Sequence, residues 1–329
     1  MKKEELYTPP FTITDEITSL VIAIGEAVGR LSVTSNNVPS PHLRKENRIK
    51  TIQSSLAIEN NTLSVEQVTA IIEGKRVLGA PNEIKEVKNA VDAYELLFEL
   101  NPFKEKDLLR AHKLMMSDLV RENGRFRSGG VGVFGEQGLV HLAPPAIRVP
   151  SLIGDLLHWA KTTKTHPLIC SCVFHYEFEF IHPFADGNGR MGRMWQTLLL
   201  MQWNPIFAWI PVETIVKEHQ QEYYNAIALC DKQGESTSFV SFMLRCLYSA
   251  LQDFQKSDTE SSTEGGTEKT VDKIIQLIKV NPQITSRAIA QKLSMAHSGV
   301  AKHLRNMQNS GIIRRVGPQK GGHWEVVGK

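Results

Sequence analysis

The chain has 329 residues, of which 41% are hydrophobic and 22% charged, with a formal net charge of +3. This length is long for one compact core, so we expect about two domains. There is no uninterrupted apolar run long enough to span a bilayer, and residues 1–10 lack the apolar stretch of a secretory signal, which excludes the membrane classes and predicts a cytoplasmic protein.

Charge divides the chain into three parts. Residues 269–329 contain eleven Lys or Arg against two acidic residues, whereas residues 257–268 contain four acids and no bases. The acidic stretch has no apolar side chain to bury, which is typical of a solvated linker. We therefore predict a main domain at 1–256, a linker at 257–268 and a basic domain at 269–329.

The main domain is predicted to be mostly helical, because its apolar residues recur at spacings of three and four. The expected helices cover residues 17–31, 44–57, 64–74, 84–100, 105–120, 150–161, 167–180, 188–202, 216–230 and 239–255. Four cysteines lie in apolar helical surroundings without zinc or disulfide spacing, so we predict buried free thiols.

One segment departs from the helical period. Residues 131–142 alternate about a glycine-containing turn, which predicts a β-hairpin that ends at Pro144-Pro145. A surface hairpin without a partner is one interpretation of such a segment.

The residues with the clearest chemistry lie between two apolar helices, in residues 182–193. Two glycines and an asparagine permit a tight turn whose amides converge at a helix N-terminus, which is a site for phosphate. Arg190 and Arg193 place two guanidinium groups on one helical face, and Asp186 supplies an oxygen ligand of the kind that Mg²⁺ accepts. His182 is able to remove a proton near neutral pH. Each residue alone is typical of an ordinary loop, but together they favour a polyphosphate site.

The stretch His182-Pro183-Phe184-Ala185-Asp186-Gly187-Asn188-Gly189-Arg190-Met191-Gly192-Arg193 resembles the signature of the Fic family at every defining position. The resemblance extends over most of residues 44–247, including 124–127 and 143–145. It implies a mainly α, Fic-type helical bundle with a β-hairpin flap. It also implies the family's usual reaction, in which AMP passes from ATP to a Ser, Thr or Tyr hydroxyl of a target protein and pyrophosphate leaves.

The resemblance assigns roles to individual residues. His182 would be the general base, Asp186 would hold Mg²⁺, Arg193 would meet the γ-phosphate, and Phe184 would anchor the loop in the core. The implied nucleotide-binding residues are Asp186, Gly187, Asn188, Gly189, Arg190, Met191, Gly192, Arg193, Tyr223 and Tyr224. Core packing is the alternative for one of the two tyrosines. In the hairpin, Val140, His141 and Leu142 would pair with an extended segment of the target.

A second family feature lies upstream, in the segment Ser55-Leu56-Ala57-Ile58-Glu59-Asn60. It resembles the inhibitory pattern of Ser or Thr, three residues, Glu, then Gly or Asn, in the class whose inhibitory helix is N-terminal. Glu59 paired with Arg193 would occupy the guanidinium that the γ-phosphate needs. In some relatives the equivalent glutamate also directs water to remove AMP, so the reverse reaction stays open.

The basic domain resembles a winged helix-turn-helix. Amphipathic segments at 271–280, 285–293 and 298–308 precede an apolar segment at 310–313 and a basic glycine-rich turn at 317–322. The side chains that would face phosphates are Lys302, His303, Arg305, Arg314, Arg315 and Lys320. Since many winged helices contact proteins instead, DNA and protein both stay open as its partner.

Two hypotheses about function follow, and a third keeps the enzyme of the first but changes the donor, since some relatives move other phosphate-containing groups. The presence of both Arg190 and Arg193 favours a triphosphate. The first is a protein adenylyltransferase that uses ATP and Mg²⁺, is inhibited by Glu59 and acts on a target protein. The second is a transcription regulator in which the same body senses nucleotide without turnover while the basic domain binds DNA. A homodimer stays open in both.

Overall fold

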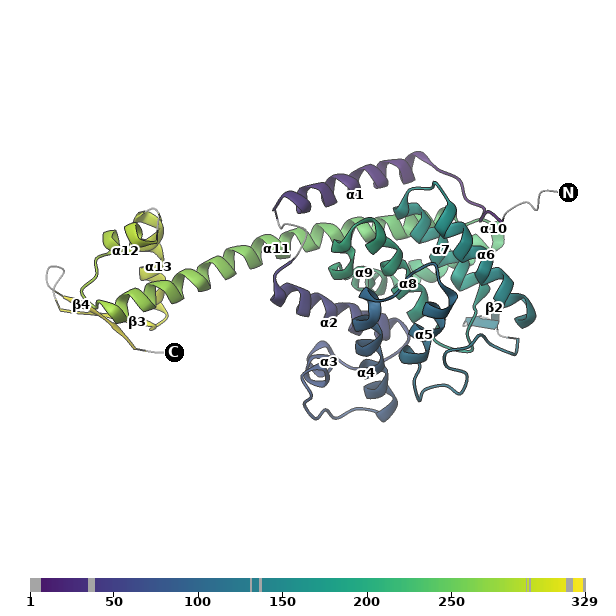
Figure 1. Cartoon of the computed structure of the whole chain (residues 1–329), viewed down its shortest axis with the longest axis horizontal. Helices are drawn as coiled ribbons and strands as arrows, with labels where there is room; N and C mark the ends of the chain where they lie inside the picture. Colours follow the sequence, from purple (N-terminus) through teal and green to yellow (C-terminus); the bar gives the residue numbers. More distant parts are fainter. Residues whose placement is uncertain are drawn as a thin grey trace. The chain divides into compact units, whose positions relative to one another are not determined.

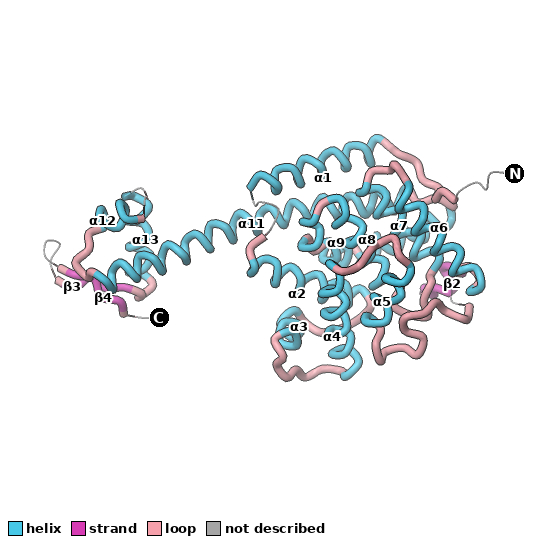
Figure 2. The backbone as a smooth tube through the Cα atoms, viewed as in Figure 1, coloured by secondary structure: helices cyan, strands magenta, loops and turns pink. Residues whose placement is uncertain are grey.

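The computed structural model describes residues 7–34, 39–130, 132–135, 138–293, 295, 297–317 and 322–327. The chain forms two compact units, Met1–Gln255 and Lys256–Lys329, and each has its own hydrophobic core. Both are built mainly from helices, with short strands in each (Figures 1 and 2). The mainly α fold predicted from the sequence is confirmed.

The first unit consists of helices with one hairpin inserted after α5. Its elements are α1 (Asp15–Thr34), α2 (Pro41–Ile58), α3 (Val65–Ile72), α4 (Pro81–Glu95), η1 (Leu96–Phe98), α5 (Glu105–Met115), β1 (Gly132–Gly135), β2 (Gly138–Leu142), η2 (Ala146–Arg148), α6 (Val149–Thr162), α7 (Pro167–Ile181), α8 (Asn188–Trp203), η3 (Pro205–Trp209), α9 (Val212–Glu218), α10 (Gln220–Gln233) and the first part of α11 (Thr237–Val280).

Local sequence signals explain where several helices begin. Ser40 caps α2 by accepting a hydrogen bond from the amide of Leu43, and Pro41 occupies the first helical position, where no amide is needed. Ser64 and Gln67 form a reciprocal capping box at the start of α3. These caps satisfy amides that have no partner within the helix.

Helices α7 and α8 form the centre of the core. Almost every side chain of α7 between residues 168 and 178 is buried, and so is nearly every side chain of α8 up to residue 200. Trp195 of α8 is fully buried, and its indole nitrogen donates to the carbonyl of Pro102 at 2.9 Å. The loop that joins α7 to α8 is therefore held by the core at both ends.

Two N-terminal helices lie over this centre. Helix α1 runs alongside the first part of α11 (Figure 1), where Gln255 donates to the carbonyl of Ala27 at 2.9 Å. Helix α2 packs on α8 and α9. Its C-terminal end consequently lies beside the start of α8.

Two predicted helices end differently in the structure. The helix expected at 105–120 stops at Met115, and turns follow in which Asp118 has a φ of 58°. The helix expected at 216–230 is two helices, because His219 has φ −108° and ψ 32°, outside the helical region, between α9 and α10. The hydrophobic period continues through both breaks, so it gave no sign of them.

Residues 257–268 have helical backbone and lie within α11. The segment contains no proline, and helix propagation adds one hydrogen bond for each residue that joins an existing helix. Composition alone predicted a solvated linker there.

The second unit continues from the end of α11 with α12 (Ser286–Lys292), α13 (His297–Asn309), β3 (Ile313–Val316) and β4 (His323–Val326). The two strands are antiparallel, with Ile313 opposite Val326 and Arg315 opposite Trp324. Ile274, Ile289, Leu304 and Trp324 are among the side chains of its core. The order of helices followed by a strand pair is that of the predicted winged helix.

Two further findings concern the whole described chain. Cys170, Cys172, Cys230 and Cys246 are all free and buried, as predicted. Within the described ranges, no helix is both long and apolar enough to cross a membrane.

The core of the second unit depends on Trp324, whose indole nitrogen donates to the carbonyl of Ile284 at 3.2 Å. Trp324→Ala should destabilise this unit by about 3–5 kcal/mol, because it removes a large buried side chain. Amide hydrogen exchange followed by mass spectrometry should accelerate in α12 and α13 and stay unchanged in α7 and α8. Unchanged exchange in α12 and α13 would show that the indole is not part of a packed core.

Candidate active site

The loop between α7 and α8 contains two residues in the left-handed conformation. His182 ends α7 with a φ of 49°, and Gly187 precedes α8 with a φ of 84°. A Cβ atom at Gly187 would lie 2.6 Å from the sulfur of Met116, so both the backbone angle and the space require glycine. These two residues allow the chain to turn from α7 into α8 within a short loop.

Arg127 fixes the backbone at His182. Its guanidinium is buried and donates from Nε to the carbonyl of His182 at 2.7 Å, from Nη1 to Gly129 at 2.8 Å and from Nη2 to Pro144 at 2.5 Å. Another bond from Nη2 reaches the carbonyl of Ile181 at 3.3 Å. Left-handed backbone is unfavourable for a residue with a Cβ, and these bonds hold His182 in it.

The imidazole of His182 is oriented by its own helix. Its Nδ1 lies 3.2 Å from the carbonyl oxygen of Glu179. A carbonyl oxygen only accepts hydrogen bonds, so Nδ1 bears the hydrogen and the neutral ring has its lone pair on Nε2. His182 therefore presents Nε2 as the atom able to accept a proton.

Phe184 and Asn188 anchor the loop in the protein core. Phe184 is fully buried, and its ring stacks on that of His112 with centroids 3.6 Å apart. The side-chain amide of Asn188 bonds both the nitrogen and the carbonyl of Phe184 at 2.9 Å. Phe184 is thus the expected anchor, and the polar atoms of Asn188 are used by the loop itself.

His112 is a structural part of the site that the sequence pattern did not reveal. Its Nδ1 accepts from the amide of Gly124 at 2.9 Å, and its Nε2 lies 3.0 Å from the carbonyl of Asp186. Burial lowers the pKa of His112 to about 4. A neutral imidazole with its hydrogen on Nε2 satisfies both neighbours.

Arg190 pairs with two carboxylates. Its Nη1 lies 3.1 Å from Glu86 and its Nη2 lies 3.1 Å from Asp186. The oxygen of Asp186 that meets Arg190 also accepts from the amide of Gly187 at 2.5 Å. Arg190 is buried, whereas the side chain of Asp186 is 56% exposed. Asp186 is thus fixed at one oxygen while its carboxylate borders the solvent.

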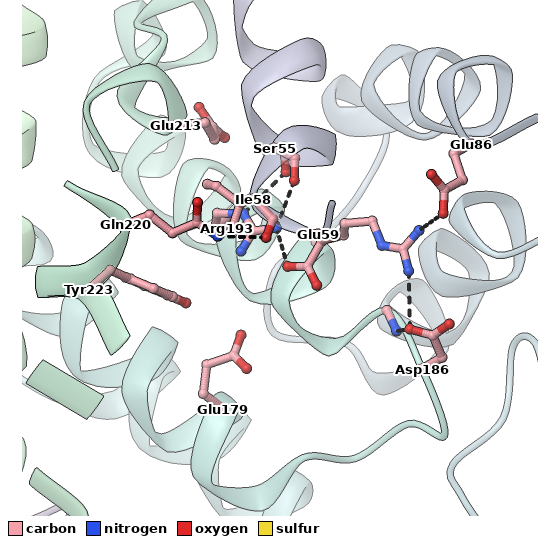
Figure 3. A network of polar contacts seen from close by, with 12 residues as sticks. Ser55, Ile58, Glu59, Glu86, Glu179, Asp186, Arg193, Glu213, Gln220 and Tyr223 are labelled. Carbon is pink, nitrogen blue, oxygen red and sulfur yellow. Dashed lines mark hydrogen bonds and ion pairs between the residues drawn. The ribbon is translucent and has the colours of Figure 1, made fainter. Parts of the chain in front are cut away.

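Arg193 is buried and pairs with Glu59 across more than a hundred residues of sequence. Its Nη2 donates to Glu59 Oε1 at 2.7 Å and to the carbonyl of Ser55 at 3.0 Å, while its Nε lies 3.2 Å from Ser55 Oγ. Burial acts to lower the pKa of Arg193, but the nearby carboxylate of Glu59 raises it above its usual value. Figure 3 shows Glu59 directed at this guanidinium from the end of α2.

The carboxylate of Glu59 also lies against the first turn of α8. A Cβ atom built on Gly189 would come within 2.3 Å of Glu59 Oε1, so only a glycine leaves room for the carboxylate there. A helix N-terminus favours negative charge, and Arg193 adds a second positive group. The fold therefore places an anion at the position where the sequence predicts phosphate.

The guanidinium of Arg193 has one further nitrogen to account for. Nη1 of Arg193 is buried and has no hydrogen-bond partner among the residues that the structure describes. Buried donors are almost always paired, so this atom points to a ligand or water at the site.

The two predicted tyrosines differ in position. Tyr223 is buried, and its hydroxyl lies 3.2 Å from Nε2 of His175. Tyr224 is 43% exposed, and its hydroxyl donates to the carbonyl of Ile58 at 3.3 Å. The exposed ring of Tyr224 is accessible to a nucleotide, so the predicted contact stays a prediction for this residue. Tyr223 packs in the core, which is the alternative expected for one of the pair.

Two other predicted residues follow the loop on α8. The side chain of Met191 is fully buried in the hydrophobic core. At Gly192, a Cβ atom would come within 2.7 Å of Glu179 Oε1 and 3.0 Å of the His175 ring. Gly192 thereby allows α7 and α8 to approach closely beside the site.

The predicted flap forms a hairpin of two antiparallel strands, β1 and β2. Val140, His141 and Leu142 belong to β2, and the register shifts between Val133 and Phe134. Residues 131, 136 and 137 lie outside the described residues, as do the side chains of the hairpin. Through Pro144, the chain that follows β2 is bonded to the same guanidinium as His182.

A metal site built by protein ligands alone is absent from the described ranges, where no three His, Cys, Asp or Glu side chains are grouped to hold an ion. Mg²⁺ is usually bound through only one or two carboxylates together with waters and substrate phosphates. The half-exposed carboxylate of Asp186 fits that kind of site.

Comparison with known proteins identifies two segments. Residues 102–200 match the model of the Fic/DOC family, and residues 269–314 match a winged helix-turn-helix DNA-binding model. A solved structure of a Fic family protein from Desulfovibrio desulfuricans G20 is 47% identical, with a TM-score of 0.79 over 98% of this chain and 99% of that chain.

Two relatives are each named Protein adenylyltransferase Fic. The one from Aedes aegypti is 29% identical over 242 residues, which is 70% of this chain and 46% of the relative. The one from Culex quinquefasciatus is 30% identical over 229 residues, which is 66% of this chain and 44% of the relative. The chain therefore spans less than half the length of these curated relatives.

The lowered pKa of His112 predicts a dependence of stability on pH. The neutral form is favoured in the fold, so its contribution is complete above the unfolded value of about 6.5 and is lost as the pH falls toward 4. Between pH 7 and pH 5, wild type should lose about 2 kcal/mol more of its free energy of unfolding than His112→Gln. Urea denaturation followed by tryptophan fluorescence measures this difference, and parallel pH profiles would contradict it.

Proposed function

This chain belongs to the Fic family, and we propose that it is a protein adenylyltransferase that transfers AMP from ATP to a hydroxyl side chain of a target protein. The observation that supports this most directly is the position of the Glu59 carboxylate, against Gly189 and 2.7 Å from Arg193. The site accepts an anion at a helix N-terminus, close in sequence to a histidine whose Nε2 can take a proton. The names of the two insect relatives point to the same reaction.

The mechanism assigns a separate task to each group. Nε2 of His182 accepts the proton of the target hydroxyl while its oxygen forms a bond to the α-phosphorus of ATP. The bond from that phosphorus to the oxygen of pyrophosphate breaks, and pyrophosphate leaves. Arg193 and the amides at the start of α8 hold the negative charge of the phosphate chain, so that positioning and charge neutralisation lower the barrier.

Asp186 is the residue that would hold Mg²⁺. When bound, this ion would neutralise charge on the phosphates. Arg190, which pairs with Asp186 and Glu86 at 3.1 Å, orients the Asp186 carboxylate toward the loop. The protein would thus supply one fixed oxygen ligand, and phosphate oxygens and waters would supply the others.

Glu59 would inhibit the enzyme by competition. Its carboxylate occupies Arg193, which the γ-phosphate requires, and adds a negative charge that repels the nucleotide. Because α2 belongs to the same chain, this competitor is always present at the site. Productive binding of ATP then requires that Glu59 leave Arg193.

The target protein would bind at the hairpin. An extended segment that pairs with β2 would bring its hydroxyl to the side of the loop where His182 lies. A cavity of about 250 Å³ beside Pro144, Pro145 and Ile181 offers room for a neighbouring side chain of the target. Arg127 donates hydrogen bonds to the carbonyls of Pro144 and Ile181, which line this cavity, and to that of His182.

The alternative is a regulator that binds nucleotide without turnover. Such a regulator would bind the nucleotide at Arg193, as the enzyme does, but would not use His182 to transfer a proton. Covalent transfer of label from ATP that depends on His182 favours the enzyme, whereas retention of nucleotide without transfer favours the sensor.

Glu59→Gly should raise the labelling of proteins in a lysate by labelled ATP. Loss of a charge-assisted hydrogen bond to a buried guanidinium corresponds to about 1.5–3 kcal/mol, so we expect an increase of roughly 10-fold or more. Gel autoradiography gives the rate, and mass spectrometry of the labelled proteins identifies the modified hydroxyl.

Two further variants serve as controls for this experiment. Glu73→Gly changes the glutamate at the end of α3, which pairs with Lys45 rather than with the site, and should leave labelling unchanged. His182→Ala in the Glu59→Gly chain should abolish labelling. Equal labelling with and without Glu59 would disprove the inhibition, and labelling that survives the loss of His182 would disprove its role as the base.

The second unit is proposed to contact DNA, because its family model is that of a DNA-binding domain and α13 exposes Lys302 and Arg305. His303 is only half-exposed on the same helix. Arg314 pairs with Glu325 at 2.6 Å and Arg315 stacks on Trp324 at 4.8 Å, so these two arginines are engaged within the strand pair. Lys320 lies outside the described residues. The helix is therefore the better candidate for binding phosphates.

Replacing both Lys302 and Arg305 by alanine should weaken binding to a random-sequence DNA duplex. The slope of log affinity against log salt should become shallower by about 0.9 for each phosphate that the variant no longer binds. Fluorescence anisotropy at several salt concentrations measures both quantities. Gln308→Ala, on an exposed position of the same helix, is the control, and an unchanged salt slope in the double variant would argue for a protein partner.

A further inference from the structure

The last turn of α2 ends beside the site with its carbonyl groups accounted for. The amides of residues 59–61 donate hydrogen bonds to the carbonyls of Leu56 and Ala57 at 3.0–3.1 Å. Nη2 of Arg193 donates to the carbonyl of Ser55 at 3.0 Å. The final carbonyls of a helix have no partner within it, so each must find one elsewhere.

The carbonyl of Ile58, directly before Glu59, finds its partners on α10. Nε2 of Gln220 donates to it at 2.9 Å, and the hydroxyl of Tyr224 donates at 3.3 Å. Gln220 and Tyr224 are four residues apart and therefore lie on one face of α10. Figure 3 shows Gln220 and Ile58 next to Arg193.

We propose that Gln220 is a positioning residue for Glu59: by bonding the carbonyl of Ile58 it keeps the end of α2 in place and so holds the carboxylate on Arg193. This inference rests on the proposed inhibition by Glu59. Gln220 acts on the carboxylate through one peptide group of the main chain. It has no part in binding the phosphates.

The geometry favours Gln220 over Tyr224 in this role. The bond from Gln220 is the shorter of the two, and Gln220 is less exposed than Tyr224. Tyr224 also lies at the position expected near the nucleotide. Without Gln220, the last turn of α2 loses its nearer partner and the carboxylate spends less time on Arg193, so ATP competes more successfully.

The test is Gln220→Leu, which keeps the size of the side chain but removes its donor, made in the wild-type chain and in the Glu59→Gly chain. A neutral hydrogen bond of this kind predicts that the labelling rate with ATP well below its KM rises about 2- to 10-fold when Glu59 is present. In the Glu59→Gly chain the same substitution should change the rate by less than about 1.5-fold, because Gln220 acts through Glu59. Equal effects in the two chains would be additive and would indicate independent sites.

Gln221→Leu is the matched control, because Gln221 is exposed and its side-chain amide donates to Asn225 of the same helix. It should leave labelling unchanged in both chains. Amide exchange over residues 56–61, which requires no activity, should accelerate in Gln220→Leu and not in Gln221→Leu.

Three results would overturn the proposal. They are unchanged exchange at residues 56–61, faster exchange without faster labelling, and an equal rise of labelling in both chains. If Glu59→Gly itself labels nothing, the proposed enzymatic function fails instead. In that case, affinity for ATP by calorimetry takes the place of labelling, and Gln220→Leu must tighten it about 2- to 10-fold only while Glu59 is present.

Discussion

The buried guanidinium of Arg193 is the constraint around which the site is organised. A charge removed from water is costly unless an opposite charge and hydrogen bonds compensate it, and Arg193 has only 3% of its surface exposed. Glu59 supplies that compensation at 2.7 Å, and Ser55 adds two hydrogen bonds. In the proposed function a phosphate group would take the place of the carboxylate, because both are anions with several acceptor oxygens. The inhibited and the nucleotide-bound forms would thus differ by which anion stands at the start of α8.

The same region shows how a loop can be rigid without regular structure. Two residues distant in sequence bind its main chain: Arg127 donates to the carbonyl of His182, and His112 lies close to that of Asp186. Asn188, at the start of α8, bonds both polar main-chain groups of Phe184. Each of these side chains is buried. A loop that is proposed to carry out catalysis must keep its geometry to within fractions of an ångström, and these bonds hold it from inside the core.

Much of this arrangement was predictable from the sequence. The loop and the Glu59–Arg193 pair were predictable because the residues that form them occur in compact motifs. Glu86, His112 and Gln220 were not, since they meet their partners across sequence separations of 104, 74 and 162 residues. Each is a single polar residue on a helix whose apolar spacing concerns packing, so no local pattern marks it. The breaks after Met115 and at His219 were missed because the hydrophobic period continues through them.

Arg127 has a consequence that reaches beyond His182. One fixed positive charge is surrounded by carbonyl oxygens of residues 129, 144, 181 and 182, a kind of oxygen that also serves as a ligand in calcium sites. Here the cation is covalently part of the chain. The contact between these chain segments therefore needs no ion from solution and does not respond to chelators. An arginine side chain also keeps its proton over the whole physiological range of pH.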